Sequence, residues 1–404
     1  MNNIDYKLLA KKYGTPYYVY DFDYITKQYT ILKDAFKARK SLIAYAVKAN
    51  SNLSLIKHLS SLGSGVDCVS IGEVKRSIKA GVPKYKIIFS GVGKSDDEIS
   101  LALQLDILMI NVESNAELNR IELIASKLDK IARISIRVNP NIDPKTHPYI
   151  STGLHENKFG VDINTAKRMY IKCKNSKFLD PNGIHMHIGS QLTKLEPIKE
   201  SLEIVASLVK NLLALDIKLK FFDVGGGLGI VYDNEVLIDV NDYVQSIFKS
   251  LFGLDLTVIC EPGRFLVGNS GDFVTKVLYE KINGDKRFVI VDGAMNDLLR
   301  PSLYNAYHKI EVLNSNSNSS LCNIVGPICE SGDFFAKDIN LVQTFSNDLL
   351  IIKSAGAYCF TMSSNYNTRG RVAEVSILDN NDKLIRRRET FEDLISYEEE
   401  FLNS

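Results

Sequence analysis

Short apolar runs alternate with longer amphipathic segments between about Tyr24 and Ser270. The runs are rich in β-branched residues and are bounded by polar or glycine-containing turns, which is the pattern of buried strands. The expected strands cover residues 42–47, 66–69, 87–89, 107–110, 134–138, 184–188, 221–224 and 257–260. Because strands that alternate with helices pair in parallel, this pattern predicts a (β/α)8 TIM barrel, with a doubly wound sheet as the structural alternative.

Several of the intervening helices are expected to begin at a capping box. In this motif a serine side chain and a glutamate three residues later bond the exposed backbone N–H groups of the helix start. The pairs that fit are Ser70/Glu73, Ser95/Glu98 and Ser114/Glu117. Helix starts at these points support the strand–helix alternation.

From about Gly271 onward the apolar positions are typical of strands rather than helices. The expected strands cover residues 273–279, 287–291, 309–313, 321–325, 348–352 and 371–378, with a hairpin turn at 378–383 and a low-complexity loop at 314–320. Tyr17-Tyr18-Val19-Tyr20 precedes the first barrel repeat and predicts one more strand. We therefore expect an α/β barrel domain over 24–270, and a β-sandwich or barrel domain over 1–23 and 271–404 that the N-terminal strand completes.

Charge and cysteine content narrow the class of partner. The 404 residues include 49 basic and 48 acidic side chains, so no polybasic surface indicates nucleic acid or an anionic membrane. The six cysteines form no CxxC pair, which argues against a disulfide framework or a zinc site. With no leader-like start and no apolar run of membrane-spanning length, we expect a cytoplasmic protein that acts on a small molecule.

Lys48 follows the first expected strand, and function collects at the carboxyl ends of barrel strands. A lysine here has two interpretations. It can be a solvated residue at a strand end, or a partly desolvated amine that forms a Schiff base with a carbonyl compound or with pyridoxal phosphate. The other strand ends are the places to test these interpretations.

Some of those ends carry weaker signals. After the second strand, Asp67 and the segment 70–73 are consistent with a turn and a helix cap. The long segment 139–158 is a candidate lid or a surface excursion. His185 and His187 share one face of the sixth strand, so a metal pair is conceivable. No third ligand presents itself, however, and we expect no metal, with one histidine stacking on a planar ligand instead.

The seventh strand runs into Gly225-Gly226-Gly227, and the eighth runs into Glu261-Pro262-Gly263-Arg264. A glycine cluster alone also serves any tight turn. These two loops are nevertheless where barrels often bind phosphate, because bare backbone can bring its N–H groups against the anion. A phosphorylated cofactor near Lys48 is therefore plausible.

Five motifs occur together and in order along the chain. They are 45–50 (Tyr-Ala-Val-Lys-Ala-Asn), 187–191 (His-Ile-Gly-Ser-Gln), 225–227 (Gly-Gly-Gly), 261–264 (Glu-Pro-Gly-Arg) and 329–333 (Cys-Glu-Ser-Gly-Asp). In these motifs, and over nearly its whole length, the chain closely resembles the diaminopimelate decarboxylases, pyridoxal-phosphate enzymes of the alanine-racemase-like fold.

The resemblance implies a function and a set of site residues. The activity would be decarboxylation of meso-2,6-diaminopimelate to L-lysine and CO2, the last step of lysine biosynthesis. Lys48 would form a Schiff base with pyridoxal 5'-phosphate, and His187 would stack on its ring. Other cofactor-binding residues would be Ser190, Gly227, Glu261, Pro262, Gly263, Arg264 and Tyr358. The substrate would be held by Arg264, Arg300, Tyr304, Glu330 and Tyr358.

The resemblance also implies a homodimer with shared active sites. Cys329 would donate a proton during catalysis, and Cys329 and Glu330 would reach the site from the partner subunit. A cysteine thiol is mostly protonated at neutral pH, which suits a proton donor. Taken alone, a cysteine in an apolar segment is more often an inert small hydrophobe.

The residue types suit this chemistry. A carboxylate at 261 raises the pKa of the cofactor's ring nitrogen and keeps it protonated, whereas a racemase of this fold is expected to have an arginine there. Arg300 suits the distal carboxylate of diaminopimelate, and Glu330 suits its ammonium group.

Other functions stay open. The nearest is a same-fold decarboxylase acting on arginine, ornithine or carboxynorspermidine, although an aspartate after Cys329 would fit ornithine better. A non-catalytic cofactor-binding homologue and an isomerase are the remaining hypotheses. The presence of Lys48, Glu261 and Cys329 disfavours a non-catalytic homologue. Glu261 also disfavours an isomerase.

Overall fold

The computed structural model of the chain describes residues 4–143, 157–313 and 318–402. The chain divides into two compact units. The barrel unit comprises Thr26–Ile230 and Val236–Leu266, and the sheet unit comprises Met1–Ile25, Val231–Glu235 and Val267–Ser404. Most of the candidate lid at 139–158 and most of the loop expected at 314–320 lie outside the described residues.

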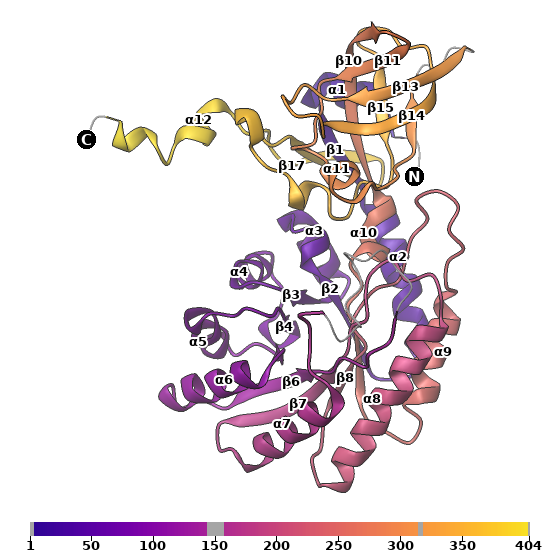
Figure 1. Cartoon of the computed structure of the whole chain (residues 1–404). Helices are drawn as coiled ribbons and strands as arrows, with labels where there is room; N and C mark the ends of the chain where they lie inside the picture. The colour runs from indigo at the N-terminus through magenta and orange to yellow at the C-terminus, as the bar shows by residue number, and fades with distance from the viewer. Residues whose placement is uncertain (1–3, 144–156, 314–317, 403–404) are drawn as a thin grey trace. The chain divides into compact units, whose positions relative to one another are not determined.

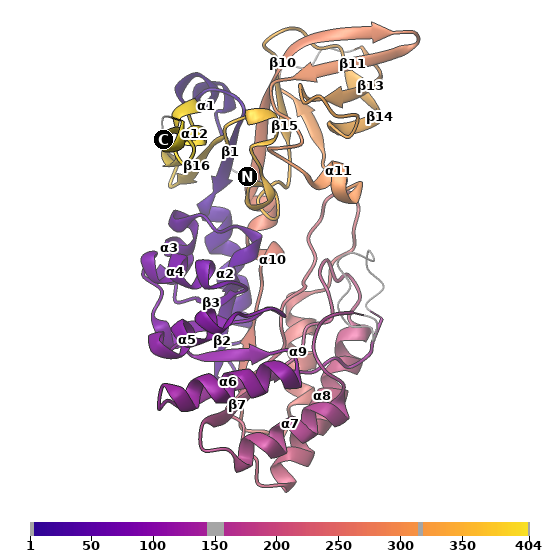
Figure 2. The same cartoon turned by 60° about the vertical axis from the view of Figure 1, so that its left-hand side comes forward.

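Eight parallel strands close in chain order into a barrel, which confirms the TIM barrel and excludes the doubly wound sheet (Figures 1 and 2). The strands are β2 (Ser41–Ala46), β3 (Gly65–Cys68), β4 (Ile87–Phe89), β5 (Met109–Val112), β6 (Ala132–Arg137), β7 (Leu179–His185), β8 (Phe221–Asp223) and β9 (Thr257–Cys260). The helices that alternate with them are α2 (Phe22–Ala35), α3 (Leu53–Ser61), α4 (Ile71–Lys79), α5 (Asp96–Leu105), α6 (Asn115–Lys127), α7 (Ile163–Asn175), α8 (Glu196–Ala214), α9 (Val240–Ser250) and α10 (Arg264–Val267). Within the described ranges, every helix is too short or too polar to cross a membrane.

An apolar layer and a polar layer follow each other inside the barrel. Ile88 and Met109 belong to a buried apolar cluster. Ser90 and Asn111, two residues further along the same strand directions, are buried and hydrogen-bonded to each other at 3.0 Å. Side chains two residues apart on a strand share a face, so the polar layer lies on the carboxyl side of the apolar one. Polar side chains on this side of the apolar layer are the first indication of a site at the carboxyl ends of the strands.

Strand β7 begins earlier than its apolar run predicts. It starts at Leu179 and includes Pro181, which lacks the N–H that a strand normally donates. The pairing with β6 shifts register between Ile134 and Ser135, next to the proline. A local irregularity of this kind absorbs the missing donor, which is why a segment with proline still forms a strand.

The three expected capping boxes are only partly confirmed. In all three the serine accepts a hydrogen bond from the backbone N–H of the glutamate. Only at Ser95 does the glutamate, Glu98, also bond the N–H of the serine. At the other two helices the glutamate carboxylate accepts from the residue before the serine, Val69 or Glu113, at 2.7 Å in both cases. Both are the first residue after a strand, so the carboxylate serves the strand end rather than the helix cap.

The carboxyl group of Glu73, in the first turn of α4, gives the barrel unit a pH-dependent stability. Burial raises the pKa of Glu73 to about 7, with the Val69 N–H and Lys48 opposing the rise. The folded state therefore holds this proton in a range where the unfolded chain has lost it, and stability falls as pH rises from about 4.5 to about 7. We expect the difference in Tm between Glu73→Gln and the parent to shift in favour of the variant as the pH is raised from about 5 to about 8. Thermal unfolding of both proteins across this range measures the difference.

Glu98→Gln is the matched control. Hydrogen bonds, the Ser95 N–H first, lower the pKa of Glu98, so both states are ionised above about pH 5.5. Its Tm difference from the parent should stay flat over the same range. A flat profile for Glu73→Gln as well would contradict the assigned proton.

The sheet unit is a mixed sheet in the order β14-β13-β11-β10-β1-β16-β17, with β15 pairing with β10 and β12. Its elements are α1 (Tyr6–Tyr13), β1 (Tyr17–Asp21), β10 (Gly271–Asn283), β11 (Lys286–Val291), α11 (Arg300–Tyr304), β12 (Ile310–Val312), β13 (Ser319–Val325), β14 (Phe334–Val342), β15 (Leu349–Ile352), β16 (Ala373–Leu378), β17 (Asn381–Arg386) and α12 (Phe391–Ile395). Strand β1 pairs antiparallel with β10 and parallel with β16. The N-terminal strand thus completes the C-terminal sheet, as expected.

Strands β14 and β17 were not expected from the sequence. Buried and exposed residues do not alternate regularly along β14, and Asp338 within it has a positive φ of 52°. Its pairing with β13 shifts register twice, so the two-residue period is lost. Strand β17 follows the expected hairpin turn, which is confirmed: Asp379 and Asn380 both have positive φ, as a two-residue hairpin loop requires.

Candidate active site

Lys48 lies in a single 3-10 turn directly after β2. Its Nζ is 3.3 Å from Oδ2 of Asp67, and the Lys48 side chain is 37% exposed, whereas that of Asp67 is 1% exposed. Burial raises the pKa of Asp67, and the Lys48 ammonium and the hydroxyl of Ser90 oppose that rise. A half-buried amine beside a buried carboxyl group fits the second interpretation of Lys48 better than a solvated strand end.

Asp67 is a functional candidate that the sequence interpretation missed. The expected strand 66–69 included Asp67, but we assigned it to a turn with no role; it lies within β3, where the polar layer of the barrel begins. The available signal was an acidic residue inside the short apolar run Gly65-Val66-Asp67-Cys68. An ionisable residue in a buried strand needs a hydrogen-bonding or oppositely charged partner, and here Lys48 is that partner.

The two glycine-containing turns after β8 and β9 are joined to each other. The N–H of Glu261 donates to the carbonyl of Gly225 at 2.7 Å, and Gly225 N–H donates to Oδ1 of Asp223 at 2.9 Å. Gly227 has a φ of 115°, which favours glycine. A Cβ on Gly226 would lie 2.1 Å from the carbonyl oxygen of Glu261. The close approach of the two turns therefore requires glycine, and it leaves bare backbone at the carboxyl end of the barrel.

His187 is a neutral, oriented ring. Burial, then Arg137 and Lys48, lower the pKa of His187 well below its usual value. Its Nδ1 accepts a hydrogen bond from Gly226 N–H at 3.2 Å, so the ring hydrogen is on Nε2. Arg137 Nη2 donates to the backbone carbonyl of His187 at 3.2 Å. A fixed neutral imidazole is suited to packing against a planar ligand.

Arg137 is itself held by a buried ion pair, and neither partner was expected from the sequence. Its Nη1 lies 2.8 Å from Oε1 of Glu113, and both side chains are less than a tenth exposed. Oε2 of Glu113 accepts from the N–H of Gly160 at 2.7 Å. The pair thus fixes His187 and the described end of the long β6–α7 segment.

Ser190 and Arg264 connect the β7 and β9 loops. Ser190 Oγ accepts from Nε of Arg264 at 3.3 Å and from its Nη2 at 3.1 Å. Pro262 and Gly263 are buried, and the carbonyl of Pro262 accepts from the N–H of Ala46, two residues before Lys48, at 3.2 Å. The predicted cofactor-binding residues of the barrel unit therefore lie at the carboxyl ends of strands that are neighbours around the barrel.

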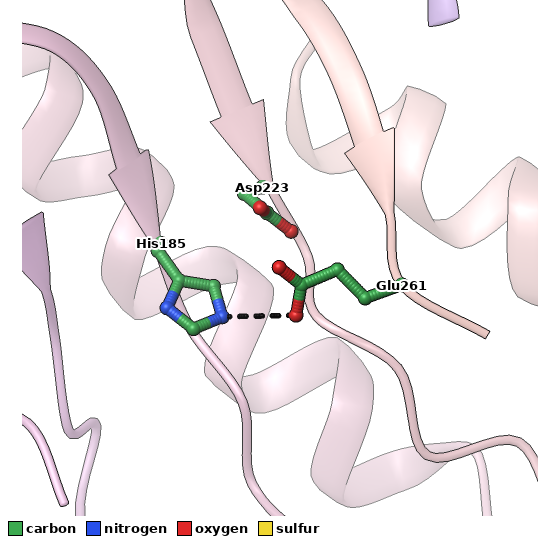
Figure 3. Close-up of side chains that lie close together, drawn as sticks. All are labelled: His185, Asp223 and Glu261. Atoms are coloured by element: carbon green, nitrogen blue, oxygen red, sulfur yellow. Dashed lines mark ion pairs between the residues drawn. The ribbon is translucent and has the colours of Figure 1, made fainter. Parts of the chain in front are cut away.

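His185, Asp223 and Glu261 form a buried cluster that we did not expect (Figure 3). One ligand atom from each lies within 4.8 Å of the other two, and His185 Nε2 is 3.3 Å from Oε2 of Glu261. The expectation that His185 has no acidic residue nearby is therefore wrong. The acids come from the two next strands of the closed barrel, a neighbourhood that spacing along one strand does not reveal.

Arg300, a predicted substrate-binding residue of the sheet unit, is buried and held by two neighbouring side chains. It begins α11, is 7% exposed, and stacks with its guanidinium 4.6 Å from the ring centre of Tyr232. Nη1 of Arg300 donates to Nε2 of His308 at 2.9 Å, so Nδ1 of His308 is the donor to the carbonyl of Lys353 at 2.8 Å. Tyr232 and His308 were not expected from the sequence.

The other predicted residues of the sheet unit are partly or fully exposed. Tyr304 and Tyr358 are half-buried, and Tyr358 has a positive φ of 58°. Cys329 and Glu330 are exposed, in a loop that Asp333 ties down by accepting from Ile328 and Met295 N–H groups at 2.7 Å. That these residues and Lys48 form one site stays a prediction.

The residues at the carboxyl end of the barrel fit pyridoxal phosphate. They provide an amine, a fixed neutral imidazole and a glycine-lined turn. They also provide a buried acceptor, because Oε1 of Glu261 has no hydrogen-bond partner among the described residues. A protonated ring nitrogen is the kind of donor that such an acceptor needs.

Comparisons with known proteins agree with a pyridoxal-phosphate site at the carboxyl end of the barrel. Residues 22–268 match the family model "Pyridoxal-dependent decarboxylase, pyridoxal binding domain". A diaminopimelate decarboxylase of Campylobacter jejuni is 60% identical over 99% of this chain and 100% of its own length. One from Helicobacter pylori strain J99 is 56% identical over 96% of this chain and 97% of its own length.

A solved structure is equally close. The crystal structure of diaminopimelate decarboxylase from Helicobacter pylori, complexed with L-lysine, has a TM-score of 0.96. It is 55% identical and covers 98% of this chain and 100% of its own. With its barrel, its lysine and its glycine turns, the chain belongs to the diaminopimelate decarboxylase family of pyridoxal-dependent decarboxylases.

Proposed function

We propose that this chain is a pyridoxal-phosphate-dependent carboxy-lyase that converts meso-2,6-diaminopimelate into L-lysine and CO2, the last step of lysine biosynthesis. One observation carries the proposal. The carboxyl end of the barrel assembles Lys48, His187 and Glu261 in a chain that is 60% identical, over 99% of its length, to a diaminopimelate decarboxylase.

The cofactor, when bound, supplies an electron sink for the negative charge left on the α-carbon by the loss of CO2. Lys48 is the residue that would anchor it. The Gly227 turn and residues 262–264 would hold its phosphate with Ser190, and His187 would pack on its ring. Tyr358 of the sheet unit is proposed as a further contact.

Glu261 acts as a fixed anion in this proposal. Burial alone would raise the pKa of Glu261, but His185, Lys48 and Asp223 lower it to about 2. The carboxylate is therefore ionised at neutral pH and holds a proton at the ring nitrogen, which keeps the electron sink effective. An arginine at this position would remove that proton.

The substrate is selected by charge at its far end. Diaminopimelate carries a distal carboxylate and a distal ammonium group. Arg300, oriented by His308 and Tyr232, suits the carboxylate, and Glu330 suits the ammonium group. Arg264 and Tyr304 are proposed as further substrate contacts. The Helicobacter pylori relative is complexed with L-lysine, the product proposed for this chain.

Release of CO2 from a panel of amino acids tests the function. Purified protein with added cofactor is expected to release CO2 from meso-diaminopimelate and to form L-lysine in equal amount. Arginine, ornithine and carboxynorspermidine are the comparison substrates, and Lys48→Arg is the inactive control. Release from ornithine but not from diaminopimelate would show that the substrate is wrong.

Arg300→Met is expected to raise the KM for diaminopimelate by about 10²-fold, because a buried charge pair with the distal carboxylate is lost. The measurement is steady-state kinetics with saturating cofactor. Arg287→Met is the control, since Arg287 is a partly buried arginine of the same unit that pairs with Glu280. An unchanged KM in Arg300→Met would remove Arg300 from the substrate site.

A homodimer with shared active sites is part of the proposal. Cys329 and Glu330 are exposed on their own chain, which suits side chains that act in the site of a partner subunit. We also propose a cytoplasmic location, since all six cysteines are free thiols, as in a reducing compartment.

A further inference from the structure

Three buried side chains meet at the ends of neighbouring barrel strands. His185 ends β7, Asp223 ends β8, and Glu261 follows β9. All three are at most 5% exposed. Figure 3 shows His185 beside one oxygen of Glu261 and the carboxyl group of Asp223 facing the other.

Two facing oxygens in this cluster lack a donor. Over the described ranges, neither Oδ2 of Asp223 nor Oε1 of Glu261 has a hydrogen-bond partner, although both are buried. Two carboxylates that face each other in a buried site cannot both be ionised without a large cost. A single proton shared between them satisfies both atoms, because a protonated carboxyl group donates one hydrogen bond.

The surroundings decide which acid holds that proton. Glu261 has His185 at 3.3 Å and lies in the field of the Lys48 ammonium. Burial, Glu261 and Asp67 all raise the pKa of Asp223, with only the Gly225 N–H opposing them. The titratable groups that act on the pair are Lys48, Asp67, His185, His187, Tyr243 and Cys260. The proton therefore belongs on Asp223.

We propose that Asp223 and His185 are positioning residues for Glu261. Asp223 donates its carboxyl proton to Oε1 and His185 lies against Oε2, so that Glu261 stays the ionised carboxylate that keeps the cofactor's ring nitrogen protonated. The proposal rests on the proposed function. A carboxylate has about four lone-pair directions on its two oxygens, so Glu261 can accept from both neighbours and from the ring nitrogen.

Asp223 also has a structural role, and the experiment must distinguish that role from proton donation to Glu261. Its Oδ1 accepts from Gly225 N–H and so orders the glycine turn. Asparagine preserves this acceptor and offers an amide N–H where we place the carboxyl proton. Leucine removes both groups at similar size. Comparison of Asp223→Asn with Asp223→Leu therefore distinguishes a proton donor from an anion.

The test uses the holoenzyme reconstituted with pyridoxal phosphate that is ¹⁵N-labelled in the ring. We expect the ¹⁵N chemical shift of Asp223→Asn to report a protonated nitrogen, as in the wild type, and its kcat to stay close to wild type. Asp223→Leu should move the signal toward the unprotonated value and lower kcat roughly 10- to 100-fold. His185→Leu should move the signal in the same direction.

An ionised Asp223 predicts the opposite result. In that case Asp223→Asn would lose kcat as Asp223→Leu does and would shift the nitrogen signal, and this outcome would overturn the proposal. If Asp223→Leu does not retain cofactor, Asp223→Asn alone still decides between the two. Failure of the wild type to release CO2 from diaminopimelate would instead refute the proposed function, whatever the nitrogen signal shows.

Discussion

Lys48→Ala is expected to lower turnover by at least roughly 10³-fold and to abolish the absorbance band of cofactor covalently attached to the protein. The reason is that Lys48 is the amine placed at the carboxyl end of the barrel, 3.3 Å from the carboxyl group of Asp67. Absorbance spectra of protein saturated with pyridoxal phosphate, together with CO2 release, measure both effects.

Lys48→Arg separates charge from covalent chemistry. Arginine preserves a cation beside Asp67, and with it the balance of charges that affects Glu73 and Glu261. Arginine does not form the covalent bond, because it stays protonated in proteins. We therefore expect Lys48→Arg to fold with the Tm of the parent and to be as inactive as Lys48→Ala. A band of covalently attached cofactor that survives in Lys48→Ala would show that another amine is the anchor.

Cys329→Ala is expected to lower kcat roughly 10²- to 10⁴-fold, the usual contribution of a positioned proton donor, and to leave cofactor binding intact. The thiol is exposed, and its backbone N–H is held by Oδ1 of Asn367 at 3.0 Å. Cys322→Ala is the control, because Cys322 is a buried cysteine of β13 in the same unit. Unchanged turnover in Cys329→Ala would exclude Cys329 from the mechanism.

A mixture of two inactive variants tests whether the proton donor comes from a partner. If sites are shared, dissociating and remixing Lys48→Ala with Cys329→Ala in equal amounts gives hybrid dimers with one intact site, and about a quarter of wild-type activity returns. If each chain contains its own complete site, the mixture stays inactive. The same mixing experiment with Lys48→Ala alone provides the baseline.

The barrel was predictable because each buried strand is a continuous apolar run followed by an amphipathic helix, a pattern that the chain repeats. The residues that we predict to bind the cofactor could be named because motifs such as Lys48 and the turn at 225–227 are local in sequence. Their placement at strand ends followed once the barrel was assumed. The positions of the predicted site residues in the barrel unit could therefore be inferred from the sequence.

The missed residues depend on neighbours that are distant along the chain. Asp67 contacts Lys48 across a strand pair, and His185 meets Asp223 and Glu261 only because β7, β8 and β9 are adjacent in the closed barrel. Spacing along a single strand led to the question of a metal pair and could not reveal these contacts. In the sheet unit, β14 was missed because its irregular pairing hides the two-residue period.

Strand β1 has a consequence for how the nascent chain matures. It is synthesised before the barrel, yet its two pairing partners are β10, which begins at Gly271, and β16, which begins at Ala373. Both of its edges stay without these strand partners while the barrel is translated, and one of them stays so until β16 has been synthesised. A chain truncated before Ala373 would therefore expose an unpaired backbone edge of β1, which favours aggregation.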